Sequence, residues 1–159
     1  MTEEEIFQIL GRISVVYSTL DFMVTVLVME IVNDNYKSPK NALNDNMTLG
    51  KKLDIIKNLK DSDVMSVVAL QSVNKFIDDA ILISKERNRF MHDQWLFAPN
   101  DLAEGKISKL TLVNLRSWGI DNIKSDLYSA EDLNNQHYKL LQMVEKVRIT
   151  INEVRAMNK

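Results

Sequence analysis

The feature that most constrains the fold is a set of apolar residues near the start of the chain that recur alternately every three and four positions. This spacing lines one side of a long α-helix, as in a coiled-coil seam, and it returns near the end of the chain. The two sets are Ile6, Leu10, Ile13, Tyr17, Leu20, Val24, Leu27 and Ile31, and Leu133, His137, Leu140, Val144, Val147, Ile151 and Val154. They predict helices over about 2–32 and about 130–157, each with one buried side.

Two shorter helices complete the predicted bundle. Apolar residues on one face predict a helix over about 48–60, and a stripe from Val67 to Met91 predicts a third helix over about 64–91. Between them, Asp61-Ser62-Asp63 predicts a break and a cap for the third helix. The other predicted N-terminal caps are Thr2 with Glu5, Thr48, and Ser129 with Asp132.

The pattern changes between about 94 and 128, where helical periodicity gives way to partial alternation. The strings WLFA, KISKLTLVNL and IKSDLYS predict short strands, with turns at Pro99-Asn100-Asp101 and Trp118-Gly119. We therefore predict a single domain over 1–159 that is mainly α. It is an antiparallel four-helix bundle with a small β-hairpin or three-stranded insertion before the last helix.

Composition excludes several classes of function. The chain has no cysteine, which excludes disulfides, zinc–cysteine sites and thiol catalysis, and its net charge of −2 gives no general attraction to polyanions. The most apolar run, residues 22–32, is shorter than the roughly 20 residues of a membrane span. The acidic start MTEEEIF lacks the cationic region of a signal peptide. These features predict a soluble, cytoplasmic protein without a membrane partner.

The end of the third predicted helix carries an unusual group of polar residues, in the stretch KERNRFMHDQW from Lys85 to Trp95. With Ile77 at zero, an ideal helix places Asn88 at about 20° and His92 at about 60°, so both continue the apolar stripe. Arg87 lies at about −80°, within reach of that stripe through its long side chain. Polar groups therefore end a stripe that elsewhere buries hydrocarbon, and burial without partners costs a few kcal/mol.

Two explanations fit this helix end. In the structural one, His92 and Asn88 bond the backbone, and Arg87 pairs with Asp93, Asp78 or Asp21. In the functional one, a histidine that exchanges protons near neutral pH works beside an arginine that binds phosphate oxygens. Such a pair can cleave an RNA phosphodiester without a metal, because the histidine moves protons while the arginine stabilises the developing charge.

The string RNRFMH, Arg87 to His92, resembles the R-N-x-x-x-H motif of the HEPN superfamily, the nucleotide-binding domains shared by higher eukaryotes and prokaryotes. The stretch MTLGKKLDIIKNL, Trp95 and the predicted β insertion resemble a bacterial subgroup, although only the six-residue motif is specific. The resemblance implies an α-helical bundle and a metal-independent endoribonuclease. Many members are toxins of toxin–antitoxin or phage-defence systems, with the motif at a homodimer interface.

Carried over by position, the resemblance implies a site without metal or cofactor. Its partners would be a second copy of the chain, an RNA substrate and an antitoxin protein. Asp93 departs from the family pattern, which commonly has glycine there, and its carboxylate would raise the pKa of His92 or repel RNA. The implied residues are Arg87, Asn88 and His92 for catalysis, and Arg89, Lys85 and Asp21 for binding.

A second apolar set on the first predicted helix supports the homodimer, because a self-complementary apolar face is what a twofold interface requires. Its members are Val15, Val16, Phe22, Met23, Val26 and Met29. The alternative to an enzyme is a non-catalytic module of the same fold that binds a nucleotide or RNA end, or that serves in assembly. The lysine-rich segment KKLDIIKNLK is interpreted as a solvated face in preference to an RNA patch, and His137 as a core residue.

Overall fold

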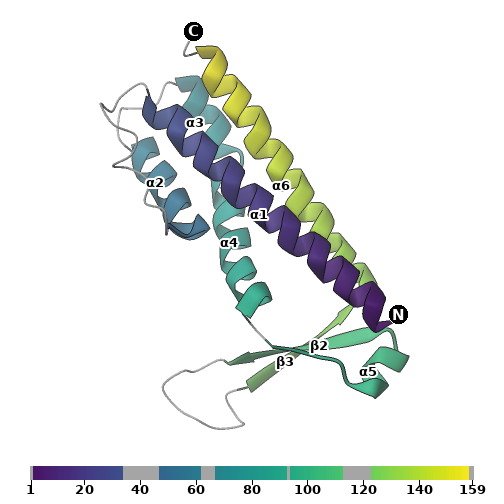
Figure 1. Cartoon of the computed structure of the whole chain (residues 1–159). Helices are drawn as coiled ribbons and strands as arrows, with labels where there is room; N and C mark the ends of the chain where they lie inside the picture. The colour runs from purple at the N-terminus through teal and green to yellow at the C-terminus, as the bar shows by residue number, and fades with distance from the viewer. Residues whose placement is uncertain (1, 34–46, 62–66, 93, 113–122, 158–159) are drawn as a thin grey trace. The chain divides into compact units, whose positions relative to one another are not determined.

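The computed structural model describes residues 2–33, 47–61, 67–92, 94–112 and 123–157 (Figure 1). These residues are mainly helical and include a small three-stranded antiparallel sheet, as predicted. The elements are α1 (Glu3–Asn33), α2 (Leu49–Asp61), α3 (Val67–Asn74), α4 (Ile77–His92), β1 (Gln94–Leu96), α5 (Pro99–Ala103), β2 (Lys106–Leu112), β3 (Ile123–Ser129) and α6 (Ala130–Met157).

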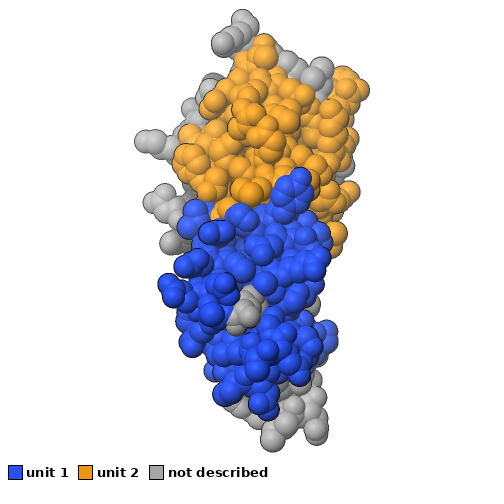
Figure 2. All heavy atoms as spheres, turned by 90° about the vertical axis from the view of Figure 1, so that its right-hand side faces the viewer, with its two compact units in different colours: residues 1–15, 86–139 blue, residues 16–85, 140–159 orange. Residues whose placement is uncertain are grey.

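The chain forms two compact units, which Figure 2 shows in different colours. Unit 1 comprises residues 1–15 and 86–139, and therefore contains the sheet, α5 and the adjoining turns of α1, α4 and α6. Unit 2 comprises residues 16–85 and 140–159, and contains α2, α3 and the remaining turns of the same three helices.

Predicted side chains cap three of the helices. At α1, the backbone N–H of Thr2 donates to Glu5 Oε2 over 2.7 Å, and the N–H of Glu5 donates to Thr2 Oγ1 over 3.2 Å. At α6, Asp132 Oδ2 accepts from both the N–H and the hydroxyl of Ser129, at 2.8 and 2.7 Å. Thr48 accepts from the N–H of Lys51 at the start of α2. Each bond satisfies a backbone donor or a capping side chain at a helix start.

The predicted seam of α1 is buried, apart from a half-buried Leu10. The second apolar set divides: Val16 is buried, whereas Val15, Phe22 and Met29 are 66%, 65% and 47% exposed. These three lie seven positions apart, so they follow one side of α1 opposite the core. These exposed side chains form an apolar stripe on α1.

The whole of α1 meets the length and hydropathy criteria for a membrane span, although its most apolar run, residues 22–32, is too short by itself. From Glu3 to Val32 it is long and apolar enough to cross a membrane, and 44% of its most apolar window is buried within the protein. The core helix of a soluble protein meets the same criterion. The finding is compatible with a soluble protein, and a cytoplasmic location stays a prediction.

The third predicted helix, about 64–91, is wrong as a single element, because it is divided into α3 and α4. At the break, the N–H of Lys75 donates to the carbonyl of Ser72 and that of Phe76 to Val73, which tightens the chain into a three-residue turn. An unbroken helix would separate Phe76 and Ile77 by about 100°. Both are almost fully buried here, and the turn allows this.

The predicted antiparallel bundle is also corrected within unit 2. Helix α6 runs antiparallel to the α3–α4 segment, because Lys146 pairs with Asp79 while Glu153, further along α6, accepts from the earlier Ser72. Helices α1 and α6, however, run in the same direction (Figure 1). Short loops force neighbouring helices to be antiparallel, whereas the long connections of this chain do not.

The sheet of unit 1 has the order β1-β2-β3 with both pairs antiparallel. The predicted turn at Pro99-Asn100-Asp101 is instead the first part of the short helix α5, which begins with the proline whose fixed φ suits that position. Gly105, with φ of 72°, then turns the chain into β2. The predicted turn at Trp118-Gly119 lies outside the described residues.

Candidate functional site

The backbone of α4 is helical through His92, so the string Arg87 to His92 occupies the final turns of this helix. The side chains of Arg87, Asn88, Arg89 and His92 lie outside the described residues, and so does Asp93. Their distances and partners therefore stay predictions. Lys85, at the start of the predicted site, is exposed.

Trp95 attaches this helix end to the sheet. Its indole Nε1–H donates to the backbone carbonyl of Phe90 over 3.2 Å, and so satisfies one of the acceptors that the last turn of a helix leaves open. Its ring contacts Phe90 edge-on at 4.8 Å between centroids and Tyr128 at 5.5 Å. One aromatic residue thereby fixes the part of α4 that carries the motif.

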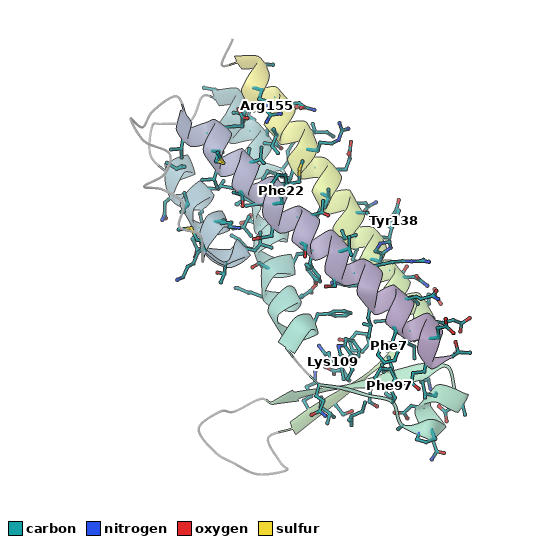
Figure 3. All side chains as sticks on the ribbon, in the orientation of Figure 1. Phe7, Phe22, Phe97, Lys109, Tyr138 and Arg155 are labelled. Carbon is teal, nitrogen blue, oxygen red and sulfur yellow. The ribbon has the colours of Figure 1, made fainter. Side chains whose placement is uncertain are left out.

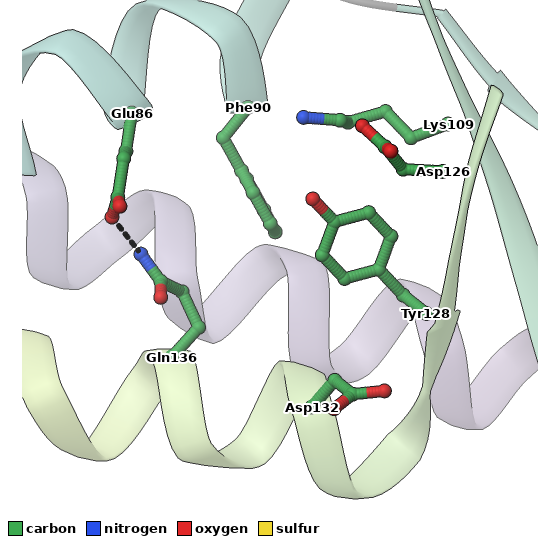
Figure 4. A pocket seen from close by; sticks show the side chains of 7 residues that line it. All are labelled: Glu86, Phe90, Lys109, Asp126, Tyr128, Asp132 and Gln136. Carbon is green, nitrogen blue, oxygen red and sulfur yellow. Dashed lines mark hydrogen bonds between the residues drawn. The ribbon is translucent and has the colours of Figure 1, made fainter. Parts of the chain in front are cut away.

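A pocket of about 220 Å³ lies on one side of this helix end, entirely within unit 1 (Figure 4). Helix α4, the sheet and α6 all contribute to it. Glu86 and Phe90 come from α4, and Phe90 belongs to the RNRFMH string itself. The lining residues are Glu86, Phe90, Lys109, Asp126, Tyr128, Asp132 and Gln136.

The sheet places a cation and a carboxylate side by side in this pocket. Lys109 on β2 and Asp126 on β3 are paired across the strands, and Trp95 is paired with Lys109 from β1. Lys109 is only 5% exposed, and its Nζ lies 5.4 Å from the centroid of the Tyr128 ring. Asp126 also pairs with Lys124, whose Nζ lies 3.0 Å from Oδ1. A cation and an aromatic ring at this distance attract each other.

Carboxylates outnumber cations among the described residues that line the pocket. Glu86, Asp126 and Asp132 face a single lysine in this set, so its formal charges of −3 and +1 leave −2. Glu86 accepts from the side-chain amide of Gln136 over 3.2 Å. Hydrogen bonds from the Ser129 hydroxyl, and then from its backbone N–H, hold the pKa of Asp132 below its usual value. Asp132 is therefore ionised at neutral pH.

Asp21, a predicted binding residue, lies in unit 2 and has a structural partner there. Its Oδ2 is 2.8 Å from Nζ of Lys52, whose side chain is only 10% exposed. Asp21 Oδ1 is buried and accepts no hydrogen bond from the described residues. The lysine-rich segment is thus not uniformly solvated, because Lys52 is buried whereas Lys51 and Lys57 are exposed.

The predicted core residue His137 is half-buried on α6. Among the described side chains, no three of histidine, aspartate or glutamate gather where they could hold a metal ion. The sequence reasoning missed Lys109, Asp126 and Tyr128 as site residues. Alternation along β2 and β3 was the available signal. It places Ile107 and Lys109 of β2 on the same face of the sheet as their partners Tyr128 and Asp126 of β3.

Comparison of the chain with protein-family models, with curated proteins and with solved structures found no match.

Proposed function

We propose that this protein is a HEPN-like, metal-independent endoribonuclease that acts as a homodimer. The observation that carries the proposal is the position of the R-N-x-x-x-H string. It occupies the final turns of α4, and the helix ends at its histidine. A motif at the end of a helix is what the family resemblance implies. The bond from Trp95 to Phe90, inside the string, supports a fixed geometry there.

In this proposal each histidine acts as a general acid or base, and each arginine binds the phosphate. Histidine is the side chain that suits proton transfer near neutral pH, and His92 supplies it in the motif. Arg87 offers a planar fork of donors for the oxygens on which negative charge develops, and Asn88 adds a neutral donor. Lys85, Arg89 and Asp21 contribute to binding. An antitoxin protein and a cytoplasmic location belong to the same proposal.

The homodimer supplies what one chain lacks. Cleavage of RNA by general acid–base catalysis benefits from two proton-transfer groups, and one motif contains a single histidine. Two motifs across a twofold axis contribute two. The exposed apolar side chains of Phe22 and Met29 on α1 support this arrangement, because a twofold interface buries the same apolar patch on both subunits.

The test is RNA cleavage in the presence of EDTA by a protein whose dimeric state has been measured by light scattering. His92→Ala removes the proposed catalytic group, and His137→Ala is the matched control because these are the only two histidines of the chain. We expect His92→Ala to lose about 100-fold or more of the activity, the usual contribution of such a group. The His137→Ala variant keeps its activity, and the products carry cyclic phosphate ends. Equal cleavage by wild type and His92→Ala would contradict the proposal.

A second candidate function is a non-catalytic module that binds RNA or assembles with a partner. The excess of carboxylates among the described lining residues of the pocket favours the assembly form of this module, since negative charge weakens binding of phosphate groups. The same assay separates the two candidates. RNA binding without cleavage, equal in wild type and His92→Ala, supports the module.

A further inference from the structure

The pocket beside the motif has the size of a small planar ligand. Its volume of about 220 Å³ lies below the roughly 300 Å³ at which sites for drug-sized molecules begin. Among the described lining residues, three carboxylates face one lysine, and this disfavours a phosphate inside the pocket. An uncharged base is therefore the part of a nucleic acid that this pocket suits.

The walls of the pocket include two aromatic side chains. Phe90, 6% exposed, comes from α4, and Tyr128 comes from β3 (Figure 4). Trp95 contacts both rings edge-on and so holds them in place. Proteins that read single-stranded RNA stack unpaired bases on aromatic side chains and bind the base edges by hydrogen bonds. In this pocket Phe90 is nearly fully buried, so the half-buried ring of Tyr128 is the stacking surface. Lys109 and Asp126 are the polar groups.

The polar groups of the pocket match one base better than the others. Lys109 provides a donor, and the neighbouring Asp126 provides a carboxylate that accepts hydrogen bonds. Guanine presents an acceptor, O6, beside two donors, N1–H and the N2 amino group, on its Watson–Crick edge. Adenine, cytosine and uracil have no pair of adjacent donors there, so a carboxylate binds them less well. The pairing of Lys109 with Asp126 across the strands thus complements guanine.

We propose that this pocket binds a guanine base of single-stranded RNA, with Asp126 accepting from N1–H and N2, and Lys109 donating to O6. The inference rests on the proposed function, which supplies RNA as the substrate. Phe90 belongs to the motif string, and an ideal helix separates its position from that of His92 by about 160°. The pocket thus lies beside the helix end that carries the motif, and in this proposal the bound guanosine makes cleavage specific for sites next to guanosine.

The experiment measures binding by fluorescence anisotropy and cleavage in EDTA on the same probes. These are labelled uridine oligonucleotides with one central guanosine, adenosine, cytidine or inosine. Inosine keeps O6 and N1–H but lacks the N2 amino group. Wild type is compared with Asp126→Asn. The matched control is Lys124→Gln, which removes the same ion pair of Asp126 but alters no residue that lines the pocket. Circular dichroism verifies that each variant is folded.

We expect the guanosine probe to bind about tenfold or more tightly than the adenosine, cytidine and inosine probes, within the range of one bidentate base contact. Asp126→Asn loses this preference, and Lys124→Gln keeps it. Equal binding of all probes by wild type, or a preference retained by Asp126→Asn, overturns the inference. Free guanosine monophosphate is a further probe. If it binds as tightly as the oligonucleotide, the proposal that the pocket binds guanine as part of RNA is refuted.

The two proposals fail separately. A guanosine preference in binding without any cleavage supports the pocket and rejects the endoribonuclease. Cleavage that depends on His92 but proceeds equally at all four probes supports the endoribonuclease and rejects the guanine pocket.

Discussion

Removing Asp21 tests whether this predicted binding residue has a structural role in unit 2. Its carboxylate lies 2.8 Å from Nζ of Lys52, and the exposed fractions of the two side chains are 40% and 10%. At an effective dielectric constant of about 20, charges at this distance attract by about 6 kcal/mol. Desolvation of the lysine, several kcal/mol, cancels much of that attraction. The pair therefore has a small net effect on stability, whereas the buried lysine without its partner has a large destabilising one.

The two single substitutions are expected to differ in their cost to stability, because Lys52 is more deeply buried than Asp21. Asp21→Ala leaves the buried ammonium of Lys52 without a counter-charge, and because Asp21 is partly exposed we expect a loss of about 2–3 kcal/mol, below the range for fully buried pairs. Lys52→Met leaves a carboxylate that water reaches, and costs about 1 kcal/mol or less. The double variant Asp21→Ala/Lys52→Met should recover most of the loss.

Urea unfolding of the four proteins measures these changes as a double-mutant cycle. Asp79→Ala is the matched control, since it breaks the exposed pair with Lys146 and should cost under about 0.5 kcal/mol. The reasoning is refuted if Asp21→Ala is as mild as this control, or if the two single effects simply add. The double variant also separates the roles of Asp21. Restored stability with RNA binding still lost would show that the carboxylate contributes to the site.

Three further predictions concern unit 1. Trp95→Phe removes the hydrogen bond to the Phe90 carbonyl and should cost about 1 kcal/mol, whereas Trp95→Ala also removes a half-buried ring and should cost about 3 kcal/mol in urea unfolding. Hydrogen exchange should rise first at the end of α4 in both variants. Gly105→Ala places a side chain at φ of 72° and should cost about 1–2 kcal/mol by thermal unfolding. The lowered pKa of Asp132 contributes stability that is complete above its ordinary pKa and is lost as the pH falls through the lowered value; Ser129→Ala should make unfolding less sensitive to acid over that range, and an unchanged pH profile would contradict the capping role.

The long helices were predictable because one seam determines which side of a helix is buried. The seam of α1 and the cap at Thr2 need only local spacing, and α6 begins and ends where the pattern predicts. The break between α3 and α4 was not predictable in this way. It depends on burying both Phe76 and Ile77, which is a property of the neighbouring helices and not of the local sequence.

The apolar seams also did not predict the relative direction of the helices. A seam specifies the buried side of a helix but is unchanged when the helix is reversed, so the parallel arrangement of α1 and α6 left no local signal. The relative direction of two helices is shown instead by ion pairs between residues far apart in the sequence. Arg155 on α6 pairs with Glu30 on α1 over 2.7 Å, and both lie in unit 2 and label the same end of the two helices (Figures 1 and 3).

The pocket was missed for a related reason. A lysine in a strand such as KISKLTL is usually solvent-exposed, whereas Lys109 is buried where β2 pairs with β3. The apolar pattern of the two strands does not by itself specify this register. Alternation alone, however, puts Lys109 on the same face as the fully buried Ile107. A cation that shares a face with core residues has to be compensated. Asp126 and Tyr128, on the neighbouring strand and the same face, are the groups that compensate it. The chemistry that we assign to guanine recognition thus arises from the same requirement that makes the sheet stable.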